Sequence, residues 1–214
     1  MRAMFDAIAP RYDLVNRIMT FGMDVGWRRR TVASLGLGQG ALVLDLACGT
    51  GDLCRELQAR GYRAVGFDLS LGMLRAATAS VPLVQGDVLR LPLRSGCADG
   101  ITCGFALRNV VDIGHLFEEM ARVLRPGGRV GILEVATPDA RLLRAGHHFY
   151  FHKVVPLVGG LLSDRDAYRY LPRSTAYLPD RATLIDKMHR AGLAGATSRL
   201  LAGGAAQLVT ATRS

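Results

Sequence analysis

The sequence predicts an α/β fold in which helices cover one mostly parallel β-sheet. From residue 41 onward, short apolar runs alternate with segments of helical period, which is typical of consecutive βαβ units. The first apolar run ends in the glycine turn Gly49, Thr50 and Gly51, and a helix begins at once. The last two apolar runs are separated only by "AGG", which predicts an antiparallel hairpin at the sheet edge.

Each element of this sheet is placed by its residue pattern. The expected strands are Ala41–Ala47, Ala64–Phe67, Leu83–Gln85, Gly100–Cys103, Arg129–Val135, Ala196–Leu201 and Ala206–Thr212. The expected helices are Asp52–Arg60, Leu71–Ala79, a helix from the N-cap Asp112 to Leu124, and Ala182–Ala191. Helices between strands imply right-handed crossovers and a sheet covered on both faces. "RPGG" at Arg125–Gly128 predicts a turn into the fifth strand.

Two segments lie outside this alternation, and we expect both to lie over the sheet. Residues 1–34 are predicted to form an N-terminal helical cap. Residues 137–181 contain prolines and aromatic residues but no clear strand, which predicts a lid. Because no linker or internal repeat divides the chain, residues 1–214 are predicted to form a single domain.

The charge and the apolar runs limit the classes of partner. The net charge is +9, and the arginines that supply most of it are spread along the chain. A basic surface favours nucleic acid or an anionic membrane face, but no RNA-binding motif accompanies it, so we expect no nucleic-acid partner. The run Val154–Leu162 is too short to span a bilayer and contains Pro156. With no signal peptide at the N-terminus, we expect a soluble, cytoplasmic protein.

The cysteines and histidines do not predict a metal site. None of the four cysteines forms a CxxC pair, so neither a disulfide framework nor a zinc site is expected. His148 and His152 have helical i, i+4 spacing, but no acidic residue lies between them as a zinc-protease helix requires. They are more typical of surface or packing histidines.

The most informative stretch is "LVLDLACGTGDL" at Leu42–Leu53. Glycines in its turn allow the backbone to approach a ligand closely. Asp68 ends the second strand 17 residues beyond Gly51, where a carboxylate can accept hydrogen bonds from ribose hydroxyls. A dinucleotide site requires a third glycine, but position 54 is Cys, and Asp45 and Asp52 flank the turn. Negative charge there disfavours a pyrophosphate and favours the ammonium and sulfonium of S-adenosylmethionine.

A second acidic turn agrees with this cofactor. "GDVLRLPL" follows the third strand, where Asp87 can accept a hydrogen bond from the adenine amine and the backbone N–H of Val88 can face a ring nitrogen. Asp87 alone is equally typical of an ordinary turn after Gly86. The stretch "LRPGGRVGILE" at Leu124–Glu134 is common in class I methyltransferases. The predicted fold is therefore the Rossmann-like class I methyltransferase fold.

Longer motifs resemble a narrower family. "YDLVNRIMTFGMDVGW" at Tyr12–Trp27, "GFALRNV" at Gly104–Val110 and "RVLRPGGRVGILEVAT" at Arg122–Thr137 are similar to the ubiquinone/menaquinone-biosynthesis C-methyltransferases. The resemblance covers nearly the whole chain, and it includes "DAYRYLPRSTAYLP" in the lid. At Asp24 and Ala106 this chain has residues other than the His and Gly that are usual in that family.

The resemblance implies methyl transfer from S-adenosylmethionine to a ring carbon of a prenylated quinol such as demethylmenaquinol. The cofactor-binding residues that we expect are Tyr12, Asp45, Gly49, Thr50, Gly51, Asp68, Leu69, Met73, Asp87, Val88 and Gly104. The expected catalytic residues are Arg108, Asn109 and Tyr168. Arg108 would stabilise a phenolate or orient a water, because an arginine cannot readily act as a base. The alternative is that Arg108 pairs with Asp112 or Glu134 and only caps the strand end.

The aromatic lid and its apolar run have several uses that the sequence leaves open. His148 and Tyr170 are candidates to contact quinol oxygens, although for each of them a packing role is favoured. The run Val154–Leu162 suits an isoprenoid tail channel, a core-facing helix or a homodimer contact. Transient contact with a membrane surface, at the inner membrane face, would bring the protein to a lipid-resident substrate. The other functions that we consider are a methyltransferase for another phenolic or polyketide substrate and a non-catalytic cofactor- or RNA-binding protein.

The N-terminal motif is expected to serve both packing and binding. Leu14, Val15, Ile18 and Met19 lie on one apolar helical face that should pack on the core, with Asp13 as the N-cap. Because the cap should lie over the carboxyl ends of the strands, we expect Tyr12 to cover the cofactor. Asn16 and Met19 are expected at the mouth of the substrate site.

Overall fold

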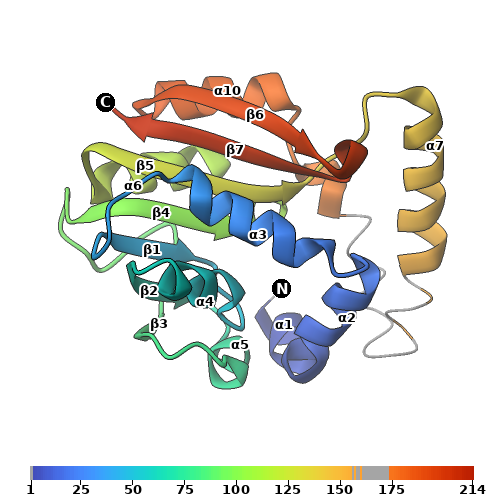
Figure 1. Cartoon of the computed structure of the whole chain (residues 1–214), viewed down its shortest axis with the longest axis horizontal. Coiled ribbons are helices and arrows are strands. Elements are labelled where there is room, and N and C mark those ends of the chain that lie inside the picture. The colour runs from blue at the N-terminus through green and yellow to red at the C-terminus, as the bar shows by residue number, and fades with distance from the viewer. Residues whose placement is uncertain (1, 156, 158–159, 161–173) are drawn as a thin grey trace.

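A seven-stranded sheet forms the centre of the part of the chain that the computed structural model describes, residues 2–155, 157, 160 and 174–214 (Figure 1). The strands are β1 Leu42–Leu46, β2 Arg63–Asp68, β3 Leu83–Gln85, β4 Ala98–Gly104, β5 Leu124–Val135, β6 Leu193–Leu201 and β7 Ala206–Arg213. Their order is β3-β2-β1-β4-β5-β7-β6. The pairings among β1 to β5 are parallel, and β7 is antiparallel to both β5 and β6. The predicted mostly parallel sheet with a closing hairpin is confirmed.

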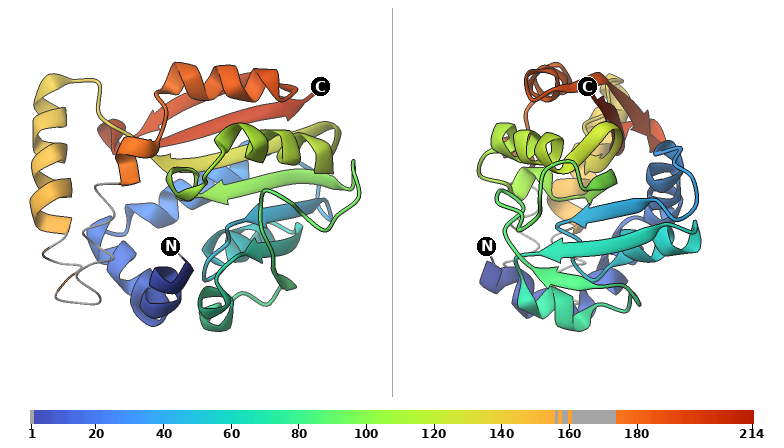
Figure 2. Two further views of the ribbon diagram at one scale, coloured as in Figure 1. Left: turned by 180° about the vertical axis from the view of Figure 1, so that it is seen from behind. Right: turned by 90° about the vertical axis from the view of Figure 1, so that its left-hand side faces the viewer.

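Helices lie on both faces of this sheet. The α-helices are α1 Arg2–Ile8, α2 Tyr12–Met19, α3 Met23–Ser34, α4 Asp52–Ala59, α5 Leu71–Ala76, α6 Ile113–Val123, α7 Arg141–Phe149 and α10 Arg181–Arg190. Shorter helical turns are Ala9–Arg11, Leu107–Asn109, Tyr150–Val154, Thr175–Tyr177 and Ala202–Gly204. Figures 1 and 2 show α3 and α4 on one face and α6 and α10 on the other. No helix in these ranges has the length and apolar composition of a membrane-spanning segment.

The core explains why the central strands are continuous apolar runs. Leu44 and Leu46 of β1 pack with α6 and α10, whereas Val43 packs with Leu57 of α4 on the opposite face. Because β1 is buried on both faces, apolar residues do not alternate with polar ones along it. This is usual for the strands of a parallel sheet. Its one charged residue, Asp45, is fully buried.

Several element boundaries differ from the prediction, including the end of α5, which is Ala76 and not Ala79, and both ends of β4. β5 begins at Leu124, so Arg125–Gly128 lies inside the strand and not before it. Leu124 pairs with Ala98 and Arg129 with Gly100, so a bulge absorbs the extra residues of "RPGG", where Gly127 has a φ of +77°. β6 begins at Leu193, three residues before the predicted start, because its partner β7 continues to Arg213.

Helix α2 differs from the prediction in two ways. Val15 and Met19 are buried, but Leu14 and Ile18 are 59% and 43% exposed, so only half of the predicted apolar face packs on the core. Asp13 is not the N-cap, because the helix begins at Tyr12. The Asp13 carboxylate instead accepts a hydrogen bond from the Thr50 hydroxyl at 2.5 Å, and this contact joins α2 to the glycine turn.

Candidate active site

The glycine turn after β1 has the backbone that its sequence predicts. Gly49 and Gly51 have φ values of +56° and +83°, a region that favours glycine. The turn is closed by a bond from the Gly51 N–H to the Cys48 carbonyl at 2.9 Å, and α4 begins at the next residue. A Cβ atom built on Gly49 would have no atom within 4 Å, so the backbone here lies open to a ligand.

Asp68 fixes this turn from the end of β2. Its Oδ2 accepts the Gly49 N–H at 2.8 Å, and its Oδ1 accepts the Ser70 N–H at 2.8 Å. Burial raises the pKa of the Asp68 carboxyl above its usual value, and these backbone bonds partly offset the rise. The carboxylate is therefore held in one orientation beside the turn.

A cavity of about 230 Å³ lies beside the glycine turn, and we call it the turn cavity. It brings together eight of the expected cofactor-binding residues, namely Tyr12, Gly49, Asp68, Leu69, Met73, Asp87, Val88 and Gly104. Carboxylates and apolar side chains therefore share one wall, which suits a ligand with a ribose, an aromatic base and a positive charge. Asn109, expected to be catalytic, also lines this cavity.

Three of the expected cofactor-binding residues do not line the turn cavity. Asp45 is buried behind the turn, where it accepts hydrogen bonds from Thr102 Oγ1 at 2.8 Å and Cys54 Sγ at 3.3 Å. Burial raises the pKa of Asp45 to about 7. Thr50 points to Asp13, and Gly51 packs so closely that a Cβ would lie 2.8 Å from that of Ala79. These residues shape the turn from behind.

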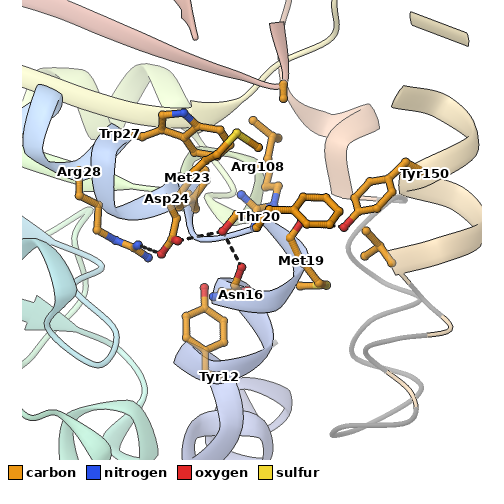
Figure 3. Close-up of a pocket in the computed structure, with 15 residues that line it drawn as sticks. Tyr12, Asn16, Met19, Thr20, Met23, Asp24, Trp27, Arg28, Arg108 and Tyr150 are labelled. Carbon is orange, nitrogen blue, oxygen red and sulfur yellow. Dashed lines mark hydrogen bonds and ion pairs between the residues drawn. The ribbon is translucent and has the colours of Figure 1, made fainter. Parts of the chain in front are cut away.

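A second cavity, of about 190 Å³, lies under the N-terminal helices, and we call it the cap cavity (Figure 3). Its lining is mainly apolar and includes Met19, Met23, Trp27, Tyr150 and Val155. Tyr150 also donates a hydrogen bond to the Met19 carbonyl at 2.8 Å and so ties the segment after α7 to α2. Asn16 and Met19, which we expect at the mouth of the substrate site, lie in this wall.

Tyr12 and Phe105 line both cavities and therefore mark their junction. Burial raises the pKa of the Tyr12 hydroxyl, while the charge of Arg108 and a hydrogen bond with Asn16 act in the opposite direction. Phe105 has a φ of +56°, a strained conformation for a residue with a side chain. Its ring lies against Trp27, with a centroid separation of 6.4 Å.

Arg108 lies in the wall of the cap cavity and is held by Glu134 of β5. Its Nη1 lies 2.5 Å from Glu134 Oε1, and both side chains are buried. The pairing that we weighed against a catalytic role is thus present. It leaves Arg108 Nε and Glu134 Oε2 without a hydrogen-bond partner among the described residues. The pair is therefore not fully satisfied within the described chain.

Neither Asn109 nor His148 lines the cap cavity with Arg108. Asn109 follows it in the chain but lines the turn cavity. His148 lines a third cavity, of about 450 Å³, together with Arg144 and Arg181. Tyr168 and Tyr170 lie outside the described residues. The sequence analysis missed Phe105, although its place between Gly104 and Arg108 could have indicated a position in the site.

Comparisons with known sequences match nearly the whole chain to one family of methyltransferases. The sequence matches the ubiE/COQ5 methyltransferase family over residues 1–213. It is 44% identical over 213 residues to a demethylmenaquinone methyltransferase of Mycolicibacterium paratuberculosis, covering 99% of this chain and 93% of that protein. It is 40% identical to the ubiquinone/menaquinone biosynthesis C-methyltransferase UbiE of Syntrophotalea carbinolica, covering 100% and 94%.

Solved structures with the same fold are more distant in sequence. A SAM-dependent methyltransferase from Thermotoga maritima superimposes with a TM-score of 0.70 at 18% identity, covering 100% of this chain and 99% of that one. Phosphoethanolamine N-methyltransferase 2 of Haemonchus contortus gives a TM-score of 0.65 at 15% identity, covering 88% and 52%. At these identities the likeness shows the fold, and it confirms the predicted class I methyltransferase fold.

The family match and the level of identity agree with the motifs at Tyr12–Trp27 and Gly104–Val110. They confirm that the chain is a methyltransferase dependent on S-adenosylmethionine, as its sequence predicted. The chain belongs to the ubiE/COQ5 methyltransferase family.

Proposed function

We propose that this protein transfers a methyl group from S-adenosylmethionine to a ring carbon of a prenylated quinol, with demethylmenaquinol as the first candidate. The observation that carries the proposal is the junction at Tyr12 and Phe105, where the turn cavity, which contains the carboxylates of Asp68 and Asp87, and the apolar cap cavity share a wall. Such an arrangement suits two ligands that meet at one point. The printed names of the relatives, demethylmenaquinone methyltransferases, support the choice of quinol.

The turn cavity would hold the cofactor. Asp68 would accept hydrogen bonds from the ribose hydroxyls, because its oxygens line the cavity while backbone bonds fix their direction. Asp87 would accept from the adenine amine, and Leu69 and Met73 would pack on the base. When bound, the cofactor supplies a methyl group activated by a positively charged sulfur.

The cap cavity would hold the quinol ring. Its apolar side chains exclude water, and its small size aligns the ring, which contributes to catalysis through proximity. Arg108 would stabilise the negative charge on a ring oxygen of a quinol that has lost its hydroxyl proton to solvent, and this charge increases electron density at the neighbouring carbon. That carbon would take the methyl group as S-adenosylhomocysteine leaves, and it would then release its own proton to solvent as the ring becomes aromatic again. Glu134 keeps the guanidinium in place, so the ion pair and the catalytic role are compatible.

An assay with labelled S-adenosylmethionine tests the function directly. We expect methylation of a short-chain demethylmenaquinol, with the benzoquinol counterpart and a simple phenol as alternative acceptors. Methylation of the phenol but of neither quinol would contradict the proposed quinol substrate and indicate another phenolic substrate. In parallel, Asp68→Asn should lose most of its affinity for S-adenosylhomocysteine in calorimetry, since hydrogen bonds to a charged group are worth about 1.5–3 kcal/mol. Affinity within twofold of the wild type would contradict the ribose assignment.

We further propose that the cap makes transient contact with an anionic membrane surface, at the cytoplasmic side. Leu14, Ile18 and Phe21 expose apolar surface along and just beyond α2, and Arg11 and Arg17 lie beside them. Exposed apolar groups flanked by arginines suit the boundary between headgroups and acyl chains. The homodimer contact proposed for the run Val154–Leu162 stays a prediction; within it, Val155 lines the cap cavity and Leu157 is exposed.

Sedimentation with phosphatidylglycerol vesicles measures this contact. Phe21 is 75% exposed, and Phe21→Ser should weaken vesicle binding roughly tenfold, from the free energy of transferring one large apolar side chain. Tyr177→Ser is the control, because Tyr177 is similarly exposed, at 70%, but lies outside the cap. Equal binding by the two variants would contradict a contact through the cap.

A further inference from the structure

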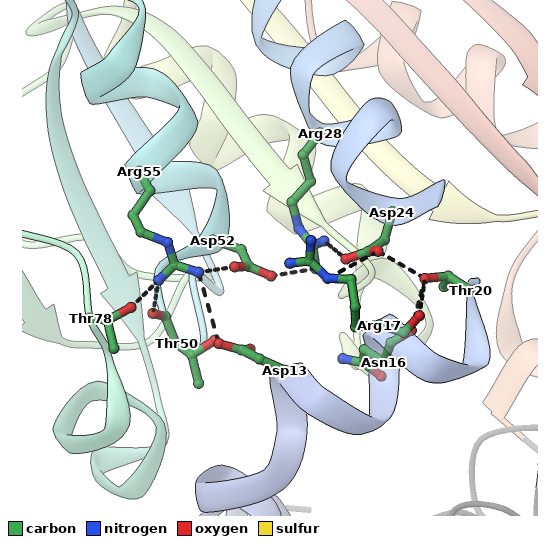
Figure 4. Close-up of polar contacts among 10 residues, drawn as sticks. All are labelled: Asp13, Asn16, Arg17, Thr20, Asp24, Arg28, Thr50, Asp52, Arg55 and Thr78. Carbon is green, nitrogen blue, oxygen red and sulfur yellow. Dashed lines mark hydrogen bonds and ion pairs between the residues drawn. The ribbon is translucent and has the colours of Figure 1, made fainter. Parts of the chain in front are cut away.

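Three neighbouring helices each contribute one aspartate and one arginine to a continuous network, which we call the charge ring (Figure 4). The members are Asp13 and Arg17 of α2, Asp24 and Arg28 of α3, and Asp52 and Arg55 of α4. Within each helix the two residues are three or four positions apart, so both lie on the same side of that helix. The charge ring thus joins the cap helices α2 and α3 to the helix that follows the glycine turn.

The contacts alternate in sign around the charge ring. Arg17 Nε lies 3.5 Å from Asp24 Oδ1, and Asp24 also pairs with Arg28. Arg28 Nη2 then reaches Asp52 Oδ2 at 2.8 Å. Arg55 pairs with Asp52 and returns to α2 at Asp13 Oδ2, at 3.9 Å. The network therefore contacts α2 at two places, at Arg17 in its second half and at Asp13 in its first turn.

Burial divides the charge ring into two parts. The side chains of Asp24, Arg28 and Asp52 are 1%, 8% and 13% exposed. Removing one partner from such a buried pair is strongly destabilising, so this part is the firmer connection between α3 and α4. Asp13 and Arg55 are each 35% exposed and Arg17 is 44% exposed, and pairs that involve such side chains are weak and screened by salt. The contacts that α2 makes, with α4 through Asp13 and with α3 through Arg17, are therefore the part that can open.

The weak part lies next to residues that line the two cavities. Asp13 is adjacent to Tyr12, which lines both cavities, and it accepts a hydrogen bond from Thr50, which is adjacent to Gly49 in the turn cavity. Bound small ligands lose most of their surface to the protein, so an element that covers the site must move for exchange. α1 has a separate tie, through Asp6 to the Gly72 N–H at 2.8 Å, so opening at Asp13 does not detach the cap.

We propose that the charge ring is a clasp on the cofactor site: the buried Asp24, Arg28 and Asp52 form its fixed side, and Asp13 with Arg55 and Thr50 forms the side that opens for cofactor exchange. Asp13 is then a positioning residue that holds Tyr12 over the junction. The proposal also gives Asp24 a role, as the carboxylate that anchors α3 on Arg28 while α2 moves. It rests on the proposed assignment of the cofactor to the turn cavity.

The single tryptophan provides the measurement. Trp27 lies in α3 one residue from Arg28 and contacts Phe105 at the junction, so its fluorescence should report ligand exchange. We expect Asp13→Asn to raise the dissociation rate of S-adenosylhomocysteine in stopped flow by about tenfold, from the loss of a hydrogen bond to a charged group. High salt should accelerate dissociation from the wild type and have little effect on the variant.

The matched control is Glu56→Gln. Glu56 pairs with Arg29 at 3.4 Å and so also joins α3 to α4, but it lies outside the charge ring. We expect its dissociation rate to equal that of the wild type. Equal rates for Asp13→Asn and the wild type, or equal acceleration by both substitutions, would overturn the clasp.

Hydrogen exchange gives a second measurement that does not depend on fluorescence. S-adenosylhomocysteine should protect the α2 amides in the wild type and protect them less in Asp13→Asn, with α3 unchanged. Loss of protection in α3 as well would indicate general loosening and contradict a local clasp. Both experiments use only the cofactor product, so they decide on the clasp even if the methylation assay rejects the quinol.

Discussion

Replacing Arg108 with methionine is expected to lower kcat for methyl transfer by roughly 10²–10³-fold, the usual effect of removing one group that stabilises a developing oxyanion. The dissociation constant of S-adenosylhomocysteine should change little, because Arg108 lines the cap cavity and not the turn cavity. Single-turnover kinetics with saturating cofactor, combined with calorimetry, separate the two quantities. Equal losses in turnover and cofactor affinity would indicate a structural role.

Stability needs its own control, because the methionine leaves Glu134 buried without its partner. Breaking a buried ion pair in this way typically costs about 3–5 kcal/mol of the free energy of unfolding. The double variant Arg108→Met/Glu134→Met replaces both charges with apolar groups and should recover most of that stability. It should not recover turnover. A double variant with normal kcat would show that Arg108 only balances Glu134.

Asp45 is expected to make the stability of the protein depend strongly on pH. Its pKa is about 7 in the folded protein, and the unfolded chain loses this proton near the ordinary value of 3.8. Between these values only the folded state binds the proton, so the contribution of Asp45 to stability is present below about pH 4 and is lost as the pH rises toward 7. The loss amounts to roughly 4 kcal/mol over that window.

Asp45→Asn should remove this dependence, because the amide stays neutral and can still accept the hydrogen bond from Thr102. We expect the variant to unfold at a higher denaturant concentration than the wild type at pH 8 and at a similar one near pH 4. Denaturant titrations at a series of pH values measure the difference. If the free energy of unfolding of the variant changes with pH between 4 and 7 as it does in the wild type, a group other than Asp45 causes the pH dependence.

The fold was predicted from patterns that extend over only a few consecutive residues. The apolar runs of β1 to β5 and the glycines of the turn specify strand, turn and helix within a few residues, and they were located closely. The bulge in β5 was missed because it depends on how Leu124 pairs with Ala98 of a neighbouring strand. Sequence period alone carries no information on that pairing.

The sequence predicted which residues meet in the turn cavity where their position at the end of a strand decides this. Asp68 and Gly104 are the last residues of β2 and β4, and Asp87 follows β3; they meet in one cavity because parallel strands end at the same edge. Asp45 shows the limit: a carboxylate beside a glycine turn can face the ligand or the core, and only the packing of Cys54 and Thr102 around it decides. The same holds for Asp13, whose partner Thr50 is 37 residues away in the chain.

Phe105 limits how the specificity of this protein could be redesigned. Its ring bounds both cavities, so trimming it to admit a bulkier acceptor would also enlarge the space around the cofactor. Its left-handed backbone narrows the choice further, since β-branched side chains are strongly disfavoured there, and glycine, or to a lesser degree Asn or Asp, would relieve the strain. Met23 and Tyr150 line the cap cavity and do not line the turn cavity. Acceptor range should therefore be engineered from these two positions, leaving the shared wall intact.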